Sequence, residues 1–191
     1  MSAKTLALAS GSPRRFELLQ LLDRPFSVVR PQVPEQIQPH ETPLAYVQRL
    51  ALSKAHAGAQ LCDADTLVLG ADTIVMCDNL VLEKPHDYQH FVRMMKMLSG
   101  KTHQAVTAVA GVLNAIEDTV VSCANVTFKT LSEAEIEAYW HSGEPQDKAG
   151  GYGIQGRASK FVTHLEGSYF AVVGLPMYET EQLIQTIEGR A

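Results

Sequence analysis

The segment Thr66–Cys77, TLVLGADTIVMC, is an apolar run with a single acid near its centre. Its length and its content of leucine, valine and isoleucine predict a buried β-strand. Burying the carboxylate of Asp72 without a partner would cost several kcal/mol. Asp72 therefore either caps a neighbouring backbone at a strand end or belongs to a functional site. Gly70 and Ala71, which would allow close approach of a ligand or a backbone, favour the functional alternative.

A second buried strand is predicted near the N-terminus, at Leu6–Ser10, and it leads directly into a helix at Pro13–Leu22. Ser12 is a favourable N-cap, and a proline is well tolerated at the first helical position. A helix start of this kind offers backbone N–H groups to an anion. Arg14 follows at the start of the helix and could bind the same anion, whereas Arg15 could also be ordinary solvated surface.

The remaining pattern alternates strands and helices with short polar connections, which predicts an α/β fold with a long mixed sheet and flanking helices. No repeat or linker divides the chain, so we expect a single domain over residues 1–191. Further strands are predicted at 26–30, 106–113, 120–129, 161–165 and 169–173, and helices at 43–58, 86–98, 132–140 and in the C-terminal segment.

Lys54 lies in a predicted helix that begins at Thr42 and Pro43. At about 100° per residue, Lys54 falls between Val47 and Leu50 on the apolar face of that helix. An isolated lysine of this kind usually keeps its stem buried and its ammonium at the edge. Near a buried acid, an inward lysine is more suggestive of a site.

Two further charged residues, Lys84 and Glu35, are candidates for the functional site because of their positions in the sequence. Lys84 precedes a proline, so its segment is extended, and a hairpin would return it toward the strand that carries Asp72. Glu35 lies in a polar, proline-rich loop and has no distinguishing local feature. Taken alone, both would be assigned to the solvated surface.

Composition excludes several classes of protein. The net charge is −5, with 16 basic residues among 191, so no overall positive field favours a nucleic acid polymer or an anionic membrane. No apolar run approaches the about 20 residues that span a bilayer. The three cysteines form no CxxC pair, which favours a reduced, cytoplasmic setting without a disulfide framework.

Six motifs occur in the order found in Maf proteins, a family of nucleoside triphosphate pyrophosphatases related in fold to inosine triphosphatases. They are LASGSPRRFELL, LGADTIV, LEKP, LSGKTHQAVTAV, DKAGGYGIQG and VVGLP. The chain resembles this family over nearly its whole length. The resemblance implies an elongated α/β fold with two lobes around a cleft, often assembled as a homodimer.

The resemblance also implies hydrolysis of the α–β phosphoanhydride with a divalent cation, Mg²⁺ or Mn²⁺. Asp72 matches the family's proton acceptor. Glu35 matches the acid of a VDE-like motif that is associated with metal or substrate binding, and the implied metal ligands are Glu35 and Asp72. That motif here reads Val33-Pro34-Glu35 and lacks the usual middle acid. The positions that line the family's phosphate site match Ser10, Arg14, Lys54 and Lys84.

Three positions resemble the branch of the family that hydrolyses dTTP and UTP: Arg14, Thr73 and Gln155. The amide of Gln155 can both donate and accept, which suits a pyrimidine edge. The resemblance extends the expected substrates to modified pyrimidine nucleotides. The alternatives are a 7-methyl-GTP pyrophosphatase, whose branch tends to carry tryptophan, glutamine and glutamate at these positions, and a nucleotide-binding regulator of cell division.

Overall fold

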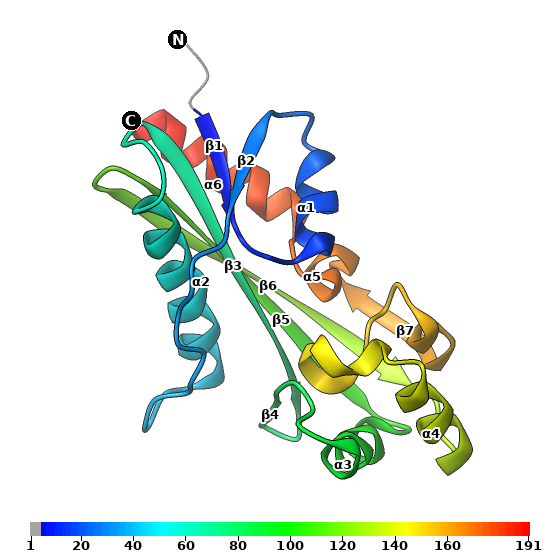
Figure 1. The fold of residues 1–191 in the computed structure, drawn as a ribbon. Helices are drawn as coiled ribbons and strands as arrows, with labels where there is room; N and C mark the ends of the chain where they lie inside the picture. The colour runs from blue at the N-terminus through cyan, green and yellow to red at the C-terminus, as the bar shows by residue number, and fades with distance from the viewer. Residues whose placement is uncertain (1–4) are drawn as a thin grey trace. The chain divides into compact units, whose positions relative to one another are not determined.

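The computed structural model describes residues 5–191, which form a mixed sheet with flanking helices (Figure 1). Within these residues the strand order is β2-β1-β3-β5-β6-β7, and β4 pairs with β3 outside this path. The strands are β1 (Thr5–Ala9), β2 (Phe26–Val29), β3 (Thr66–Cys77), β4 (Leu80–Leu82), β5 (Thr102–Leu113), β6 (Ile116–Phe128) and β7 (Val162–Gly167). The helices are α1 (Pro13–Gln20), α2 (Pro43–Ala59), α3 (Tyr88–Leu98), α4 (Glu133–His141), α5 (Tyr169–Val173) and α6 (Met177–Arg190). Short 3₁₀ helices cover Glu144–Asp147 (η1), Ala149–Gly151 (η2) and Arg157–Phe161 (η3).

The sheet contains both strand directions, as the sequence predicts. Strand β1 runs parallel to β2 and to β3, with Ala9 opposite Gly70. Strand β4 is antiparallel to β3, and β7 is antiparallel to β6. Strands β5 and β6 are neighbours joined by only two residues, a connection that suits an antiparallel hairpin.

The described chain divides into two compact units. The first comprises residues up to Asp72, together with Thr107–Ser122 and Gly174–Ala191; the second comprises Thr73–Val106 and Cys123–Val173. The boundaries fall inside β3, β5 and β6. Each unit has its own buried side chains and is described by itself below.

In the first unit, successive residues of β3 alternate between two packing surfaces, as the period of two in a strand requires. Val68 and Gly70 face α2: a Cβ on Gly70 would lie 2.3 Å from the carbonyl oxygen of Ala51. Leu67 faces the other way, where it lies near Gly111 of β5 and the side chain of Ile187 from α6. This alternation places Asp72 on the α2 side.

The second unit has an aromatic core. The side chains of Phe91, Phe128 and Phe161 are fully buried, and Tyr139 packs edge-on against Phe161. Helices α3 and α4 lie side by side over this core (Figure 1).

Two predictions about elements need correction. Residues 169–173 form α5 and not a strand, because the backbone N–H of Ala171 bonds locally to the carbonyl and hydroxyl oxygens of Ser168. Strands β5 and β6 also extend further than predicted, and only Asn114 and Ala115 separate them. Asn114 adopts a positive φ of 55°, which the sequence pattern alone does not reveal.

No helix among residues 5–191 is both long enough and apolar enough to cross a membrane.

Candidate functional site

The turn between β1 and α1 is built by two serines. The Ser12 hydroxyl accepts from the backbone N–H of Arg15 at 3.4 Å and so caps α1, as predicted. The Ser10 hydroxyl accepts from the N–H of Ser12 at 3.1 Å and is mostly buried. Arg14 is half-buried in the first turn of the helix. The first turn therefore carries a guanidinium beside the backbone N–H groups of a helix start.

Lys54 binds two acids at once. Its Nζ lies 2.6 Å from Oδ1 of Asp72 and 2.6 Å from Oε1 of Glu35. The Lys54 and Asp72 side chains are only 13% and 12% exposed, whereas that of Glu35 is 43% exposed. The first unit thus brings together three residues that the sequence analysis selected separately. Removing one partner of a pair this deeply buried would leave the other charge uncompensated.

Arg15, for which the sequence left both an anion site and ordinary surface open, interacts electrostatically with Asp72 and Glu35 of this cluster. Its Nε donates to the carbonyl oxygen of Gly174 at 2.8 Å. Burial is the main factor that lowers the pKa of Arg15; the negative charge of Asp72 acts in the opposite direction, and the neighbouring Arg14 adds to the lowering. No signal in the local sequence could have revealed the bond to Gly174, because the two residues are 159 positions apart.

Residues of α2 also hold the loop that carries Glu35. The Tyr46 hydroxyl donates to the backbone carbonyl of Glu35 at 3.2 Å. Arg49 donates to the carbonyl of Gln36 and pairs with Glu41 at 2.6 Å. The hydrogen bonds from Arg49 lower the pKa of Glu41 to about 2. The polar face of α2 therefore fixes the loop, while its inward face supplies Lys54.

The other three predicted site residues belong to the second unit. Thr73 is half-buried in β3, and Lys84 is exposed just beyond β4. Gln155 is exposed in the glycine-rich loop that follows η2. That loop is tied to the segment of Lys84, because the N–H of Gly150 donates to the carbonyl of Glu83 at 3.2 Å.

Glycine is required in this loop by close packing. Gly150 has a φ of 70°, and a Cβ on it would lie 2.8 Å from the side chain of Val75. The next residue but one, Tyr152, is buried, and its hydroxyl bonds Nε2 of His103 at 2.7 Å. The loop is therefore anchored to the second unit on either side of Gly151.

Comparison with known sequences shows the family of the chain. The profile of the family described as Maf-like protein matches residues 5–187. The chain belongs to the Maf family.

Curated relatives of this Maf chain are similar over almost their full length. A dTTP/UTP pyrophosphatase of Vibrio cholerae is 55% identical, over 96% of this chain and 98% of the relative. One from Pseudoalteromonas translucida is 57% identical, over 94% and 95%. Among solved structures, the Staphylococcus aureus Ham1 protein matches 98% of the Maf chain and 100% of its own, with a TM-score of 0.52 at 9% identity. At that identity the likeness shows the fold alone.

The carboxylate oxygens of the Maf chain fit a magnesium-type cation. Two carboxylates, of Glu35 and Asp72, approach the same ammonium. Among residues 5–191 no group of three or more aspartate, glutamate, histidine or cysteine side chains could enclose a metal. Mg²⁺ is commonly held by one or two carboxylates together with phosphate oxygens of a substrate. A pair of acids such as Glu35 and Asp72 matches that mode of binding.

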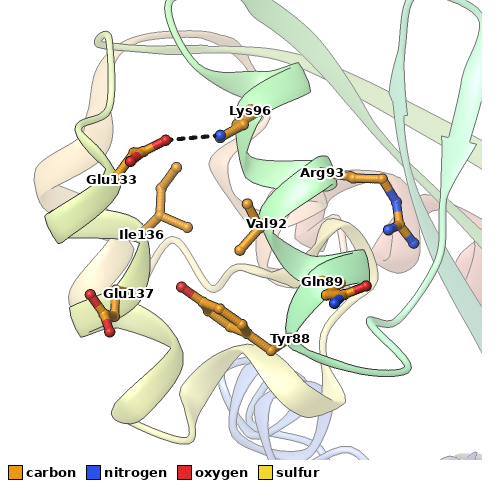
Figure 2. A pocket seen from close by; sticks show the side chains of 8 residues that line it. All are labelled: Tyr88, Gln89, Val92, Arg93, Lys96, Glu133, Ile136 and Glu137. Atoms are coloured by element: carbon orange, nitrogen blue, oxygen red, sulfur yellow. Dashed lines mark hydrogen bonds and ion pairs between the residues drawn. The ribbon is translucent and has the colours of Figure 1, made fainter.

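A separate hollow of about 460 Å³ lies in the second unit of the Maf chain, between α3 and α4 (Figure 2). It is lined by side chains of residues 88–96 and 133–137. Its cations are balanced by acids: Lys96 pairs with Glu133 at 3.0 Å, and Arg93 shares the hollow with Glu137. A triphosphate needs an excess of cations, so this hollow is a poor phosphate site.

Proposed function

We propose that this Maf protein hydrolyses dTTP and UTP to the nucleoside monophosphate and pyrophosphate. The named activity of relatives at 55% and 57% identity over nearly the full chain supports this function. The observation that carries it in the structure is the bridge from Lys54 to Asp72 and Glu35. It joins a buried carboxylate of β3 to a lysine of α2 and to the acid of the preceding loop.

The proposed first step is proton transfer from water to Asp72. Lys54 contacts Oδ1 and so fixes the orientation of the carboxylate, and Oδ2 is the proposed acceptor of the proton. The water oxygen then forms a bond to the α-phosphorus, and the bond from that phosphorus to the bridging oxygen breaks. Pyrophosphate leaves with the electron pair, and the monophosphate remains. A positioned base of this kind contributes about 10²–10⁴-fold to a rate.

Cations of the first unit are the proposed anchors of the triphosphate. Arg14 and the backbone N–H groups at the start of α1 suit phosphate oxygens, and the Ser10 hydroxyl lies at the same turn. Arg14, Arg15 and Lys54 supply three positive charges against the two negative charges of Glu35 and Asp72. The surplus positive charge favours an anionic ligand.

A divalent cation is the proposed cofactor, held by Glu35 and Asp72. When bound, such an ion neutralises charge on the phosphate oxygens and on the pyrophosphate leaving group. Lys54 would then exchange part of its contact with the two acids for contact with the nucleotide.

From the family resemblance we also propose roles for residues of the second unit. Lys84 is proposed as a phosphate ligand, and Thr73 and Gln155, like Arg14, are proposed to determine the preference for a pyrimidine base. An amide can donate to one atom of a uracil edge and accept from the next. Modified pyrimidine nucleotides that keep this edge are proposed substrates as well.

The remaining properties of the protein are proposals of the same kind. We propose that residues 1–191 act as one Maf-like domain, that the protein works in the cytoplasm and that it forms a homodimer. Sedimentation at micromolar concentration tests the dimer, for which a mass of one chain, 20.9 kDa, would be the contrary result.

Competition between UTP and 7-methyl-GTP in one reaction with Mg²⁺ tests the substrate class. We expect UTP to be consumed first, with UMP and pyrophosphate as products by phosphorus NMR. Preferential loss of 7-methyl-GTP would assign the chain to the other branch. Release of orthophosphate and UDP would contradict the proposed bond cleavage.

A further inference from the structure

The exposed amide of Gln155 is carried on a tight turn. The N–H of Gly156 donates to the carbonyl of Gly153 at 3.1 Å, so Ile154 and Gln155 are the two central residues. Ile154 is half-buried and packs against the aromatic core, whereas Gln155 is exposed. The turn therefore presents the amide outward from a fixed base.

One phenol and one carboxylate hold both ends of this turn. The Tyr139 hydroxyl donates to Oε1 of Glu144 at 2.8 Å and accepts from the N–H of Gly153 at 3.1 Å. Oε2 of Glu144 accepts from the N–H of Arg157 at 2.9 Å. Because the two bonded N–H groups flank Ile154 and Gln155, displacement of either side chain would release one end of the turn.

The backbone of Gly156 also packs closely against the side chain of Glu144. A Cβ on Gly156 would lie 2.1 Å from Oε1 of Glu144 and 2.4 Å from its Cδ. A glycine is needed there so that the carboxylate can lie directly against the backbone. Tyr139 and Glu144, called the clamp below, thus fit closely against the turn.

Tyr139 is itself rigidly held. It lies near the end of α4, is 3% exposed and contacts the rings of Phe91 and Phe161. Burial raises the pKa of Tyr139, so the phenol stays protonated and able to donate to Glu144. Glu144 is partly exposed, and its own N–H bonds the hydroxyl of Ser142 at 3.3 Å.

We propose that Tyr139 and Glu144 are positioning residues that set the place of Gln155 and thereby the preference for a uracil base over cytosine. The inference rests on the proposed function, because it concerns how the same substrate is selected. Neither residue needs to touch the nucleotide. Their removal should change recognition of the base while leaving the phosphate chemistry of the first unit nearly intact.

The decisive experiment compares Glu144→Ala, Glu144→Gln and Tyr139→Phe with wild type, using UTP and CTP as separate substrates. We expect Glu144→Ala to raise the KM for UTP about tenfold and to lower selectivity for UTP over CTP about tenfold, with kcat changed less than about twofold. Glu144→Gln keeps one carbonyl acceptor and should give an intermediate value. Tyr139→Phe leaves the N–H of Gly153 without its acceptor and should resemble Glu144→Ala.

Glu137→Gln is the matched control, because this acid lies on an exposed part of α4. Its KM and selectivity should equal those of wild type. Hydrogen exchange adds a direct readout: the amides of Gly153 and Arg157 should lose protection in Glu144→Ala and keep it in the control. A purely structural role would lower the melting temperature without changing KM or selectivity, and that result would overturn the proposal.

Failure of this inference is distinguishable from failure of the proposed function. If wild type hydrolyses UTP selectively and the folded variants keep its KM and selectivity, the clamp has no positioning role. If wild type itself does not hydrolyse UTP, the proposed function fails first. Should Glu144→Ala not fold, Tyr139→Phe and Gly156→Ala decide the question by the same readouts, since each disturbs the clamp at another point.

Discussion

Asp72 carries a charge although it lies within a buried strand, where an unpaired carboxylate would be costly. Its partner is Lys54, whose Nζ lies 2.6 Å away and which is shared with Glu35. Lys54 bonds Oδ1 of Asp72, and Oδ2 is the proposed acceptor of the proton.

Asp72→Asn tests the proton acceptor directly. The amide keeps the size of the side chain and an oxygen for Lys54, but it cannot take a proton from water. We expect kcat for UTP to fall by about 10²–10⁴-fold while the Kd for UTP changes only a few-fold. A discontinuous kinetic assay measures kcat, and isothermal titration calorimetry measures the Kd for UTP.

Asp65→Asn is the control for this substitution, since Asp65 is exposed just before β3. It should behave as wild type. A kcat within twofold of wild type in Asp72→Asn would remove Asp72 from its proposed role.

At the scale of elements, the contact between α2 and β3 positions the cluster. Gly70 lets the backbone of α2 approach: a Cβ there would lie 2.3 Å from the carbonyl oxygen of Ala51 and 2.4 Å from the amide nitrogen of Ala55. Lys54 immediately precedes Ala55, and Asp72 lies two residues beyond Gly70 on the same face of β3. The glycine therefore sets the distance between the two charged residues.

Gly70→Ala should force α2 away from the strand. Overpacking of this kind costs about 1–3 kcal/mol in the free energy of unfolding, and it should lower kcat as well because Lys54 moves with the helix. Urea denaturation measures the first effect. Gly189→Ala, in α6, meets no atom within 4 Å and should leave stability nearly unchanged. Equal stability of Gly70→Ala and wild type would contradict this account of the packing.

Local periodicity explains why much of this cluster could be predicted from the sequence. The 3.6-residue period placed Lys54 on the inner face of its helix, and the apolar run around Asp72 predicted a strand. The bond from Arg15 to Gly174 could not be predicted, because it depends on tertiary packing across 159 positions. The segment 169–173 was assigned wrongly, because its apolar and aromatic residues suit a strand while the cap at Ser168 favours a helical turn.

At the scale of the whole molecule, a buried histidine links stability to pH. His103 is 2% exposed, its Nε2 bonds the hydroxyl of Tyr152, and its Nδ1 has no hydrogen-bond partner in the described structure. Burial lowers the pKa of His103 to about 4. The unfolded chain, with an ordinary histidine pKa of about 6.5, therefore binds more protons than the folded chain between these two values.

Stability should consequently fall as the pH is lowered from about 6.5 to about 4, and this one group accounts for up to about 3 kcal/mol. Above pH 6.5 its contribution is constant. Urea unfolding as a function of pH measures the slope. His103→Gln should reduce the slope in this window, whereas the exposed His164→Gln should retain it. An unchanged slope in His103→Gln would show that other groups cause the acid sensitivity.

In the proposed reaction, water attacks the α-phosphorus of a pyrimidine nucleoside triphosphate. Hydrolysis of UTP in ¹⁸O-labelled water, followed by phosphorus NMR, tests it most directly, because the label shifts the resonance of the phosphorus that was attacked. We predict that the ¹⁸O appears in UMP and that the pyrophosphate remains unlabelled. Label in the pyrophosphate, or release of orthophosphate with UDP, would contradict the account.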